Sequence, residues 1–162
     1  MNDPVMFMEH KGIYRQGFAS SPEPDQNYLL PFGKARVVQE GSDLTIITWG
    51  ALVQQSIEAV RNTGISADII DLRTINPLDM DSILSSIQKT SRAIVAHEDN
   101  LTNGFGAEIA ARIADEGFEF LDAPVKRVAS KDSPVAYSAV LENKLLVQTG
   151  WIEKAVQELI EF

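Results

Sequence analysis

One segment, residues 92–113, constrains the fold of this chain more than any other. It begins with a continuous apolar run at residues 93–96, which is typical of a strand buried on both faces of a sheet. A polar turn follows, and then Phe105, Ile109 and Ile113 recur every four residues, which predicts one apolar face of a helix. A strand, a turn and a helix make half of a strand–helix–strand unit, so the segment predicts an α/β protein with parallel strands.

Strand and helix patterns alternate along most of the remaining chain. This alternation predicts a three-layer α/β/α sandwich with a mostly parallel mixed sheet. Strands are predicted at residues 35–40, 44–49, 67–72, 93–96 and 124–129. Helices are predicted at residues 52–63, 105–113 and 149–161, and a further helix carries Ile83, Leu84 and Ile87; a short helix is one interpretation of residues 130–147.

Three local signals refine this fold. Residues 40–43 have the composition of a turn between two strands, which predicts a β-hairpin that supplies the antiparallel strand of the sheet. Asp79 or Asp81 is placed to cap the second helix, and Thr149 is placed to cap the last one. The sequence therefore predicts the start of these helices to within a turn.

The first part of the chain differs from the rest. Residues 4–10 form an apolar run that predicts a first strand, and a strand so close to the first residue favours further polypeptide upstream. Residues 11–33 are rich in glycine and proline and show no stable period. They are either a plain surface loop or a segment wrapped over a partner. We therefore divide the chain into residues 1–33, a first strand and an irregular connection, and residues 34–162, the α/β domain.

Composition limits the function classes. A net charge of −9 and a pI near 4.6 argue against nucleic-acid or anionic-membrane partners and leave room for a basic protein partner. The sequence has no cysteine, which excludes disulfides, thiolate catalysis and cysteine-ligated metals. We expect no membrane span and no secretory signal. The expected location is the bacterial cytoplasm, or an organelle matrix in a eukaryote.

Two candidate sites lie just after the buried strand. Gly104 and Gly106 begin like a dinucleotide fingerprint, but the third glycine is missing and Glu108 occupies the first helical turn, where a pyrophosphate would have to bind. We interpret the two glycines as a tight turn with close helix–sheet packing. His97 and Glu98 suggest acid–base chemistry. Neighbouring strand residues point to opposite faces, however, so we favour a structural turn that caps the next helix.

Other signals for chemistry are weak. The only other histidine, His10, has no partner at metal-ligand spacing, and no Gly-x-Ser-x-Gly nucleophile motif is present. Trp49 follows a predicted strand as a large amphipathic side chain; it belongs either to the core or, if exposed, to a subunit interface. Taken from the residues alone, the sequence predicts an α/β domain without a self-sufficient active site.

Six blocks of the sequence nevertheless resemble one family. In the same order, they are similar to the carboxyl-terminal part of the β subunit of thiamine-diphosphate-dependent 2-oxo acid dehydrogenases, which has the transketolase carboxyl-terminal domain fold. The blocks are residues 4–7 with 14–15; 30–35; 40–43 with 48–50; 70–75 with 77–79; 97–98 with 104–109; and 122–125 with 127–128.

The resemblance implies a function for the whole enzyme and a supporting role for this chain. Thiamine diphosphate and magnesium would lie between an α subunit and the amino-terminal domain of the β subunit, so we assign no catalytic, cofactor-binding or metal-binding residue here. The implied partners are the α subunit or domain, a second β subunit and the dihydrolipoyl acyltransferase component. A small basic domain of that acyltransferase would dock at Asp122 and at the carboxylate of Phe162.

The resemblance leaves alternatives open. The segments 14–15 and 48–50 are slightly closer to branched-chain enzymes, which act on substrates such as 2-oxoisovalerate, than to pyruvate enzymes. A stand-alone docking module without a part in catalysis is a second hypothesis. A transketolase-like relative with a different donor, such as a deoxyxylulose-phosphate synthase, is a third.

Overall fold

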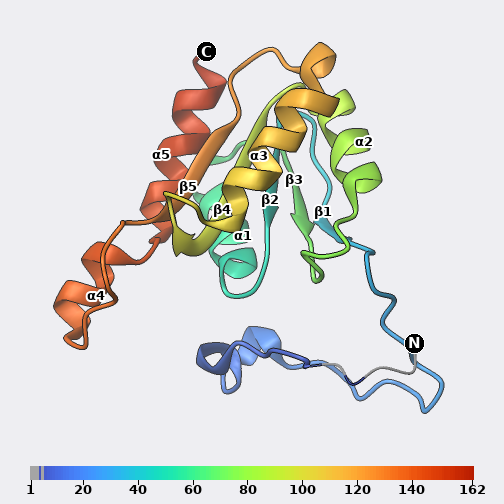
Figure 1. The fold of residues 1–162 in the computed structure, drawn as a ribbon, viewed down its shortest axis with the longest axis vertical. Coiled ribbons are helices and arrows are strands. Elements are labelled where there is room, and N and C mark those ends of the chain that lie inside the picture. The colour runs from blue at the N-terminus through green and yellow to red at the C-terminus, as the bar shows by residue number, and fades with distance from the viewer. Residues whose placement is uncertain (1–3, 5) are drawn as a thin grey trace.

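A five-stranded sheet between two helical layers forms the body of the protein (Figure 1). The computed structural model describes residue 4 and residues 6–162. The strands are β1 (Arg36–Gln39), β2 (Leu44–Thr48), β3 (Ala67–Asp71), β4 (Ala93–Asn100) and β5 (Lys126–Ser130). The helices are α1 (Leu52–Thr63), α2 (Met80–Thr90), α3 (Phe105–Glu116), α4 (Ala139–Leu145) and α5 (Thr149–Ile160), with short 3-10 turns at Lys11–Ile13, Gly17–Ala19 and Phe118–Phe120.

The strand order is β1-β3-β2-β4-β5. Strands β3, β2, β4 and β5 are parallel to one another, and β1 is antiparallel to its neighbour β3. The predicted three-layer α/β/α sandwich with a mostly parallel mixed sheet is therefore confirmed. Strand β4 extends to Asn100, so the polar residues expected in a turn continue the strand instead.

The predicted hairpin is wrong. Strand β1 pairs with β3, which lies between β1 and β2. The intervening turn crosses the start of β3: the backbone N–H groups of Ser42 and Asp43 both donate to the carbonyl oxygen of Ser66, at 3.0 and 2.7 Å. The N–H of Gly41 donates to the Asp68 carboxylate at 2.7 Å. These contacts tie the turn to β3, so the two flanking strands are separated by one strand width.

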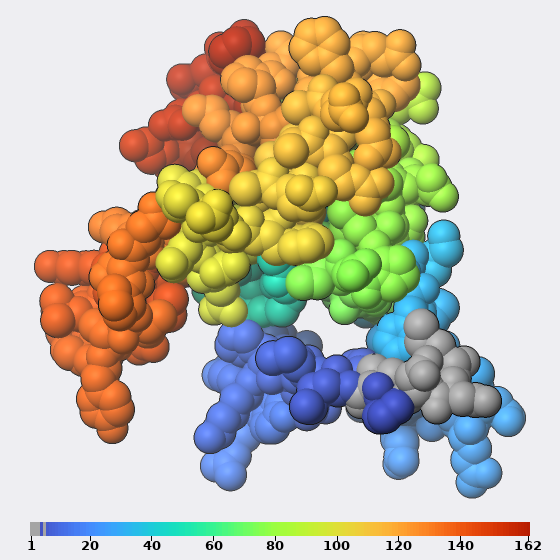
Figure 2. Space-filling model, viewed as in Figure 1, coloured from blue at the N-terminus to red at the C-terminus, as the bar shows by residue number. Residues whose placement is uncertain are grey.

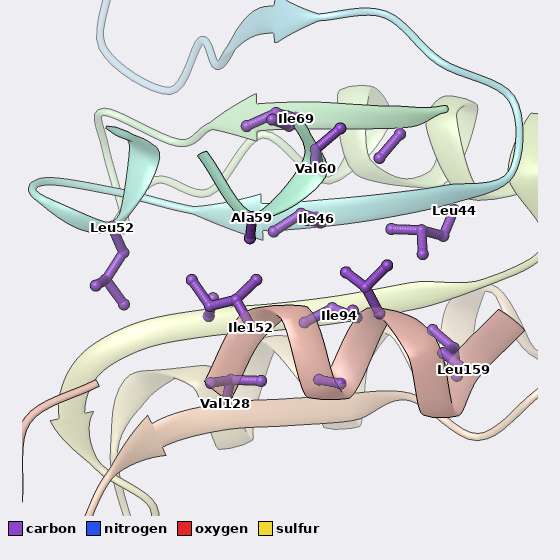
Figure 3. Close-up of a cluster of buried hydrophobic side chains, with 14 of the residues drawn as sticks. Leu44, Ile46, Leu52, Ala59, Val60, Ile69, Ile94, Val128, Ile152 and Leu159 are labelled. Carbon is purple, nitrogen blue, oxygen red and sulfur yellow. The ribbon is translucent and has the colours of Figure 1, made fainter. Parts of the chain in front are cut away.

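Two apolar clusters hold the layers together, one on each face of the sheet. On the first face, Ile46, Ile69 and Ile94 of the sheet pack against α1 and α5. From α5, Ile152 and Leu159 point at the sheet (Figure 3). On the second face, α2 and α3 supply the helical side of the cluster, which consists of Ile47, Ile70, Leu72, Met80, Ile83, Ile87, Ala93, Val95, Ile109 and Ile113. Because both faces are covered, every residue of the central strand β2 is buried, as expected for a parallel strand inside a three-layer sandwich.

Helix starts follow the predicted caps in one case and not in the other. Asp79 is the N-cap of α2 and accepts a hydrogen bond from the N–H of Ser82 at 3.3 Å. The predicted Thr149 cap is wrong, because Gln148 occupies the N-cap of α5. The Thr149 hydroxyl instead donates to the Glu58 carboxylate of α1 at 3.2 Å, so it joins the two helices of one layer.

Residues 6–33, which we call the arm, lie outside the sandwich and cross its lower end in the view of Figures 1 and 2. The first strand predicted at residues 4–10 is wrong: residue 5 lies outside the described residues, and the others belong to no strand. A strand requires a hydrogen-bonding neighbour for its backbone groups, and the described residues of this segment pair with no strand of the sheet. Large apolar side chains of the arm are exposed, namely Met6, Phe7, Met8, Tyr14, Phe18, Tyr28, Leu29 and Phe32.

Candidate docking and interface sites

The carboxyl ends of β2 and β4 form the first candidate site. The chain runs from β2 outward to β3 and then returns to β4 on the other side of β2. The strand order therefore reverses between β2 and β4, and crevices of open α/β sheets lie at such reversals. Trp49 follows the last residue of β2, and His97 lies near the end of β4. Two residues named from the sequence are thus brought together.

His97 is fully buried at this reversal. Its ring stacks parallel to the Trp49 ring, with centroids 5.5 Å apart and an interplanar angle of 2°. Gly104 and Gly106 at the start of α3 leave room for the imidazole: a Cβ on Gly104 would lie 2.7 Å from His97 Cε1, and one on Gly106 would overlap the ring. The two glycines therefore have a packing role here. The start of α3 has no side-chain cap, contrary to the predicted capping turn.

The electrostatic state of His97 follows from its surroundings. Burial lowers its pKa below the ordinary value of 6.5; the negative charge of Asp99 opposes this shift, and the positive charge of Arg127 adds to it. Neither ring nitrogen has a hydrogen-bond partner among the described residues. The imidazole is therefore neutral near pH 7, and it packs as an aromatic ring against Trp49.

Glu98 points away from the core and contacts the arm. Its carboxylate lies 2.9 Å from Nε2 of His10, and both side chains are about one-third exposed. A crevice of about 320 Å³ lies around this contact; its lining residues are Met8, Glu9, His10, Trp49, Gly50, Arg73, Glu98 and Asp99. Sequence reasoning missed His10, because its partner lies 88 positions away and local spacing carries no signal for such a pair. The structure thus separates His97 and Glu98, as their alternation along the strand predicts.

The second candidate site is a surface hollow beside α3. It has a volume of about 550 Å³ and contains both residues predicted to dock a partner, Asp122 and Phe162. Both are exposed, and the other lining residues are apolar, namely Ala110, Ala111, Ala114, Phe118, Leu121, Ala123, Pro124 and Val125. The N–H of Asp122 donates to the carbonyl of Ser91 at 2.9 Å, which fixes the backbone at this position. The hollow therefore combines an apolar floor with an acidic group.

The part of the chain that the structure describes shows neither a metal-binding cluster nor a membrane-spanning helix. No three His, Asp or Glu side chains within residue 4 and residues 6–162 converge in an arrangement that could hold a metal ion. No helix in those ranges is both long enough and apolar enough to cross a bilayer. The positive end of α3 carries Glu108 in its first turn, which disfavours a bound phosphate there.

The mixed five-stranded sheet in a three-layer sandwich is the fold of a transketolase-type carboxyl-terminal domain. Residues 33–152 match the family described as "Transketolase, C-terminal domain", and the chain belongs to that family. The fold is similar to a solved split-gene transketolase, an inactive β4 tetramer, with a TM-score of 0.70 over 86% of this chain and 46% of that chain, at 24% identity.

Several curated proteins share more of the sequence. The chain is 45% identical to the pyruvate dehydrogenase E1 component subunit beta of Bacillus subtilis, over 99% of this chain and 50% of the relative. It is 40% identical to the 2-oxoisovalerate dehydrogenase subunit beta of the same organism, with the same coverage. It is 38% identical to the mitochondrial pyruvate dehydrogenase E1 component subunit beta of Dictyostelium discoideum, over 99% and 46%. The chain spans about half the length of these relatives.

Proposed function

We propose that this chain is the carboxyl-terminal part of the β subunit of a thiamine-diphosphate-dependent 2-oxo acid dehydrogenase, where it builds the subunit assembly and docks the acyltransferase component. The relatives of similar sequence are β subunits of such dehydrogenases. The observation that carries the docking role is the hollow beside α3, in which Asp122 and Phe162 lie together. An acidic group on an apolar floor suits a basic side chain that also buries its aliphatic stem.

The net charge of the chain supports a basic partner. At −9, the chain attracts positively charged proteins over distances near the Debye length, about 8 Å at physiological salt. Such attraction raises the association rate more than the affinity. We therefore expect binding of a basic peripheral-subunit-binding domain to weaken as the salt concentration rises.

The arm supports a role in assembly. Met8 and Leu29 are 89% and 86% exposed, and isolated soluble domains rarely leave so many large apolar side chains uncovered in one segment. In the proposed enzyme the arm contacts the amino-terminal half of the β subunit, the α subunit or the second β subunit. Of the two interpretations of residues 11–33, the exposed apolar side chains favour a segment that covers a partner over a plain surface loop.

The cofactor is assigned to the rest of the enzyme. Thiamine diphosphate requires a magnesium ion with oxygen ligands and a cradle for its diphosphate, and the described residues do not fit such a site. We derive no step of the decarboxylation through this chain. Isothermal titration of the chain with thiamine diphosphate and magnesium should give no binding; tight binding would contradict this part of the proposal.

The proposed substrate is a branched-chain 2-oxo acid such as 2-oxoisovalerate, with pyruvate as the alternative. Relatives of both kinds match with similar identities, 40% and 45%. The proposed location is the bacterial cytoplasm, or the mitochondrial matrix in a eukaryote. Comparing kcat/KM of the reconstituted enzyme for the two substrates decides between them, because groups near the 2-oxo acid side chain discriminate in the transition state.

The docking role is tested by titrating the chain with a basic peripheral-subunit-binding domain. Asp122→Lys places a like charge against the partner and should weaken binding at least about tenfold. Phe162→Ala should weaken it less, because it removes apolar contact only. Glu23→Lys makes the same charge change in the arm and serves as the matched control. Equal affinities for the Asp122 variant and the control would contradict docking at the hollow.

A separate experiment tests the enzymatic role. Combining the chain with the α subunit and the amino-terminal half of the β subunit should restore oxidative decarboxylation, whereas the chain alone should have no activity. If the peripheral domain binds but no activity is restored, the chain is a stand-alone docking module. The two experiments thus separate the leading hypothesis from its alternative.

A further inference from the structure

The end of β4 connects the buried core to the arm through two adjacent side chains. His97 points into the core and stacks on Trp49, while Glu98 points outward and contacts His10 of the arm. Trp49 and His10 also line the same crevice. Any displacement of this short piece of strand therefore acts on both contacts at once.

The arm has few polar links to the sandwich. Within residues 6–32, the other recorded hydrogen bonds join arm residues to one another, for example Tyr14 to Lys11 and Asn27 to Asp25. The contact of His10 with Glu98 is the single recorded hydrogen bond between those described residues and the domain. The attachment of the arm therefore depends strongly on where Glu98 lies.

The strand is irregular at this position. In the pairing of β4 with β5, His97 lies opposite Ala129 and Asn100 lies opposite Ser130, so the two residues between them have no counterpart. The pairing of β4 with β2 ends one residue earlier, at Ala96. A bulge of this kind leaves backbone unpaired and re-aims side chains. Residues 98 and 99 can thus move without breaking the rest of the sheet.

The surroundings of His97 are unsuited to a positive charge. The ring is fully buried, its nitrogens have no partner in the described part of the chain, and Gly104 and Gly106 at the start of α3 pack directly against it. The charge of Arg127 on β5 opposes a positive charge there, and the charge of Asp99 on β4 favours it. The start of α3, which packs against the ring, carries Glu108 in its first turn. Trp49 at the end of β2 contributes no charge.

From this geometry we propose that the end of β4 is an acid-sensitive release for the arm: protonation of His97 displaces residues 97–99 and breaks the contact between Glu98 and His10. A charged imidazole lowers its energy by moving toward water and Asp99, which lies two residues along the strand. Trp49 loses its stacking partner in the same step. The arm then detaches while the sandwich stays folded.

The chain has no cysteine, so two can be introduced for spin labels without competing sites. Ser21→Cys in the arm and Gln88→Cys in α2 are both at exposed positions. Pulsed electron paramagnetic resonance should give one narrow distance at pH 8. As the pH is lowered from 8 to 5 a broad distribution should appear, and the ratio of released to attached arm should rise by at most about tenfold per pH unit. An unchanged distribution at pH 5, with circular dichroism showing an intact sandwich, would overturn the proposal.

Variants assign the response to one residue. His97→Val should keep the narrow distance at both pH values, and His97→Gln serves if the valine variant does not fold. Glu98→Ala should give the broad distribution at pH 8 already. His10→Gln should keep the acid response, because His97 is intact. Acid release that persists in both His97 variants, with circular dichroism showing an intact sandwich, would contradict the proposal.

Discussion

The sandwich and the arm place apolar side chains in opposite surroundings. In the sandwich, Ile46, Ile69 and Ile94 are 0% exposed, whereas in the arm Met8 and Leu29 are 89% and 86% exposed. Burial of an aliphatic side chain stabilises a fold by about 1.5–3 kcal/mol, so this contribution is present in one region and absent in the other. The sandwich therefore carries the stability of the chain, and the arm contributes surface for contact.

The largest expected contrast comes from truncating an aliphatic side chain in each region. Ile94→Ala removes a fully buried side chain from the centre of the sheet and should lower the free energy of unfolding by about 2–5 kcal/mol. Leu29→Ala in the arm should change it by less than about 0.5 kcal/mol. Urea unfolding followed by circular dichroism measures both. Similar losses in the two variants would show that the arm is part of the cooperative unit.

Glycine substitutions sharpen the same contrast. A Cβ on Gly41 would overlap the backbone of Ala67 at the start of β3, whereas a Cβ on Gly17 in the arm would meet no atom within 4 Å. Gly41→Ala should therefore destabilise the chain by about 3 kcal/mol, the upper end for overpacking. Gly17→Ala should be close to neutral. Thermal unfolding of the two variants is the measurement, and a neutral Gly41→Ala would disprove the close approach of turn and strand.

The sandwich and the arm also differ in how they hold a carboxylate, which is buried at Asp68 in the sandwich and exposed at Asp25 in the arm. Burial would raise the pKa of Asp68, but hydrogen bonds from Lys89, Ser86 and the N–H of Gly41 outweigh burial and lower the pKa below the ordinary value of 3.8. Since the folded pKa is below the unfolded one, this carboxylate stabilises the fold above about pH 4. The contribution is lost as the pH falls through the lowered pKa.

Asp68→Asn should therefore cost about 2 kcal/mol at pH 7, because it weakens several hydrogen bonds of a buried group. It should cost much less at pH 3. Asp25→Asn in the arm, where the carboxylate is exposed and accepts from the N–H of Asn27, is the control and should have a small effect at both values. Urea unfolding at pH 7 and pH 3 provides the test. A loss of equal size at both pH values would contradict a stabilising charge at position 68.

The smallest effect is expected from the acid titration of His97. Because burial lowers its folded pKa, the unfolded chain binds the proton first as the pH falls below about 6.5. The free energy of unfolding should then decrease by at most about 1.4 kcal/mol per pH unit from this group. The decrease should be absent in His97→Gln. His10→Gln in the arm should keep this decrease. If the decrease disappears in His10→Gln, it does not come from His97, and the prediction is wrong.

The positions of strands and helices along the chain could largely be predicted from the sequence, whereas the pairing of the strands in the sheet could not. The apolar run at residues 93–96 and the period of Phe105, Ile109 and Ile113 depend only on local geometry, and both predictions are confirmed. The predicted hairpin failed because strand pairing is a non-local choice. Residues 40–43 have turn composition in either case, and the contact with Ser66 that decides the pairing lies more than 20 positions away.

The first strand failed for a related reason. The apolar run at residues 4–10 has a composition that suits a strand, but composition does not supply a partner for its backbone. For the candidate sites, the alternation of side chains along β4 correctly predicted that His97 and Glu98 point to opposite faces. The contact of Glu98 with His10 could not be predicted from the sequence. The resemblance to 2-oxo acid dehydrogenases indicated Asp122 and Phe162, and their meeting in one hollow adds support that local patterns did not contain.

The insertion of β3 between β1 and β2 has a consequence for how the chain folds. Partners in the β1–β3 pair, such as Val37 and Ile70, are more than 30 positions apart. The pairing of β1 at the edge of the sheet therefore cannot start at a tight turn and extend from it. Loop closure over such a distance is slow compared with local pairing. The four-residue strand next to the arm is therefore expected to dock late in folding, after the parallel strands have assembled, and to be the first part of the sheet to open when the arm is pulled.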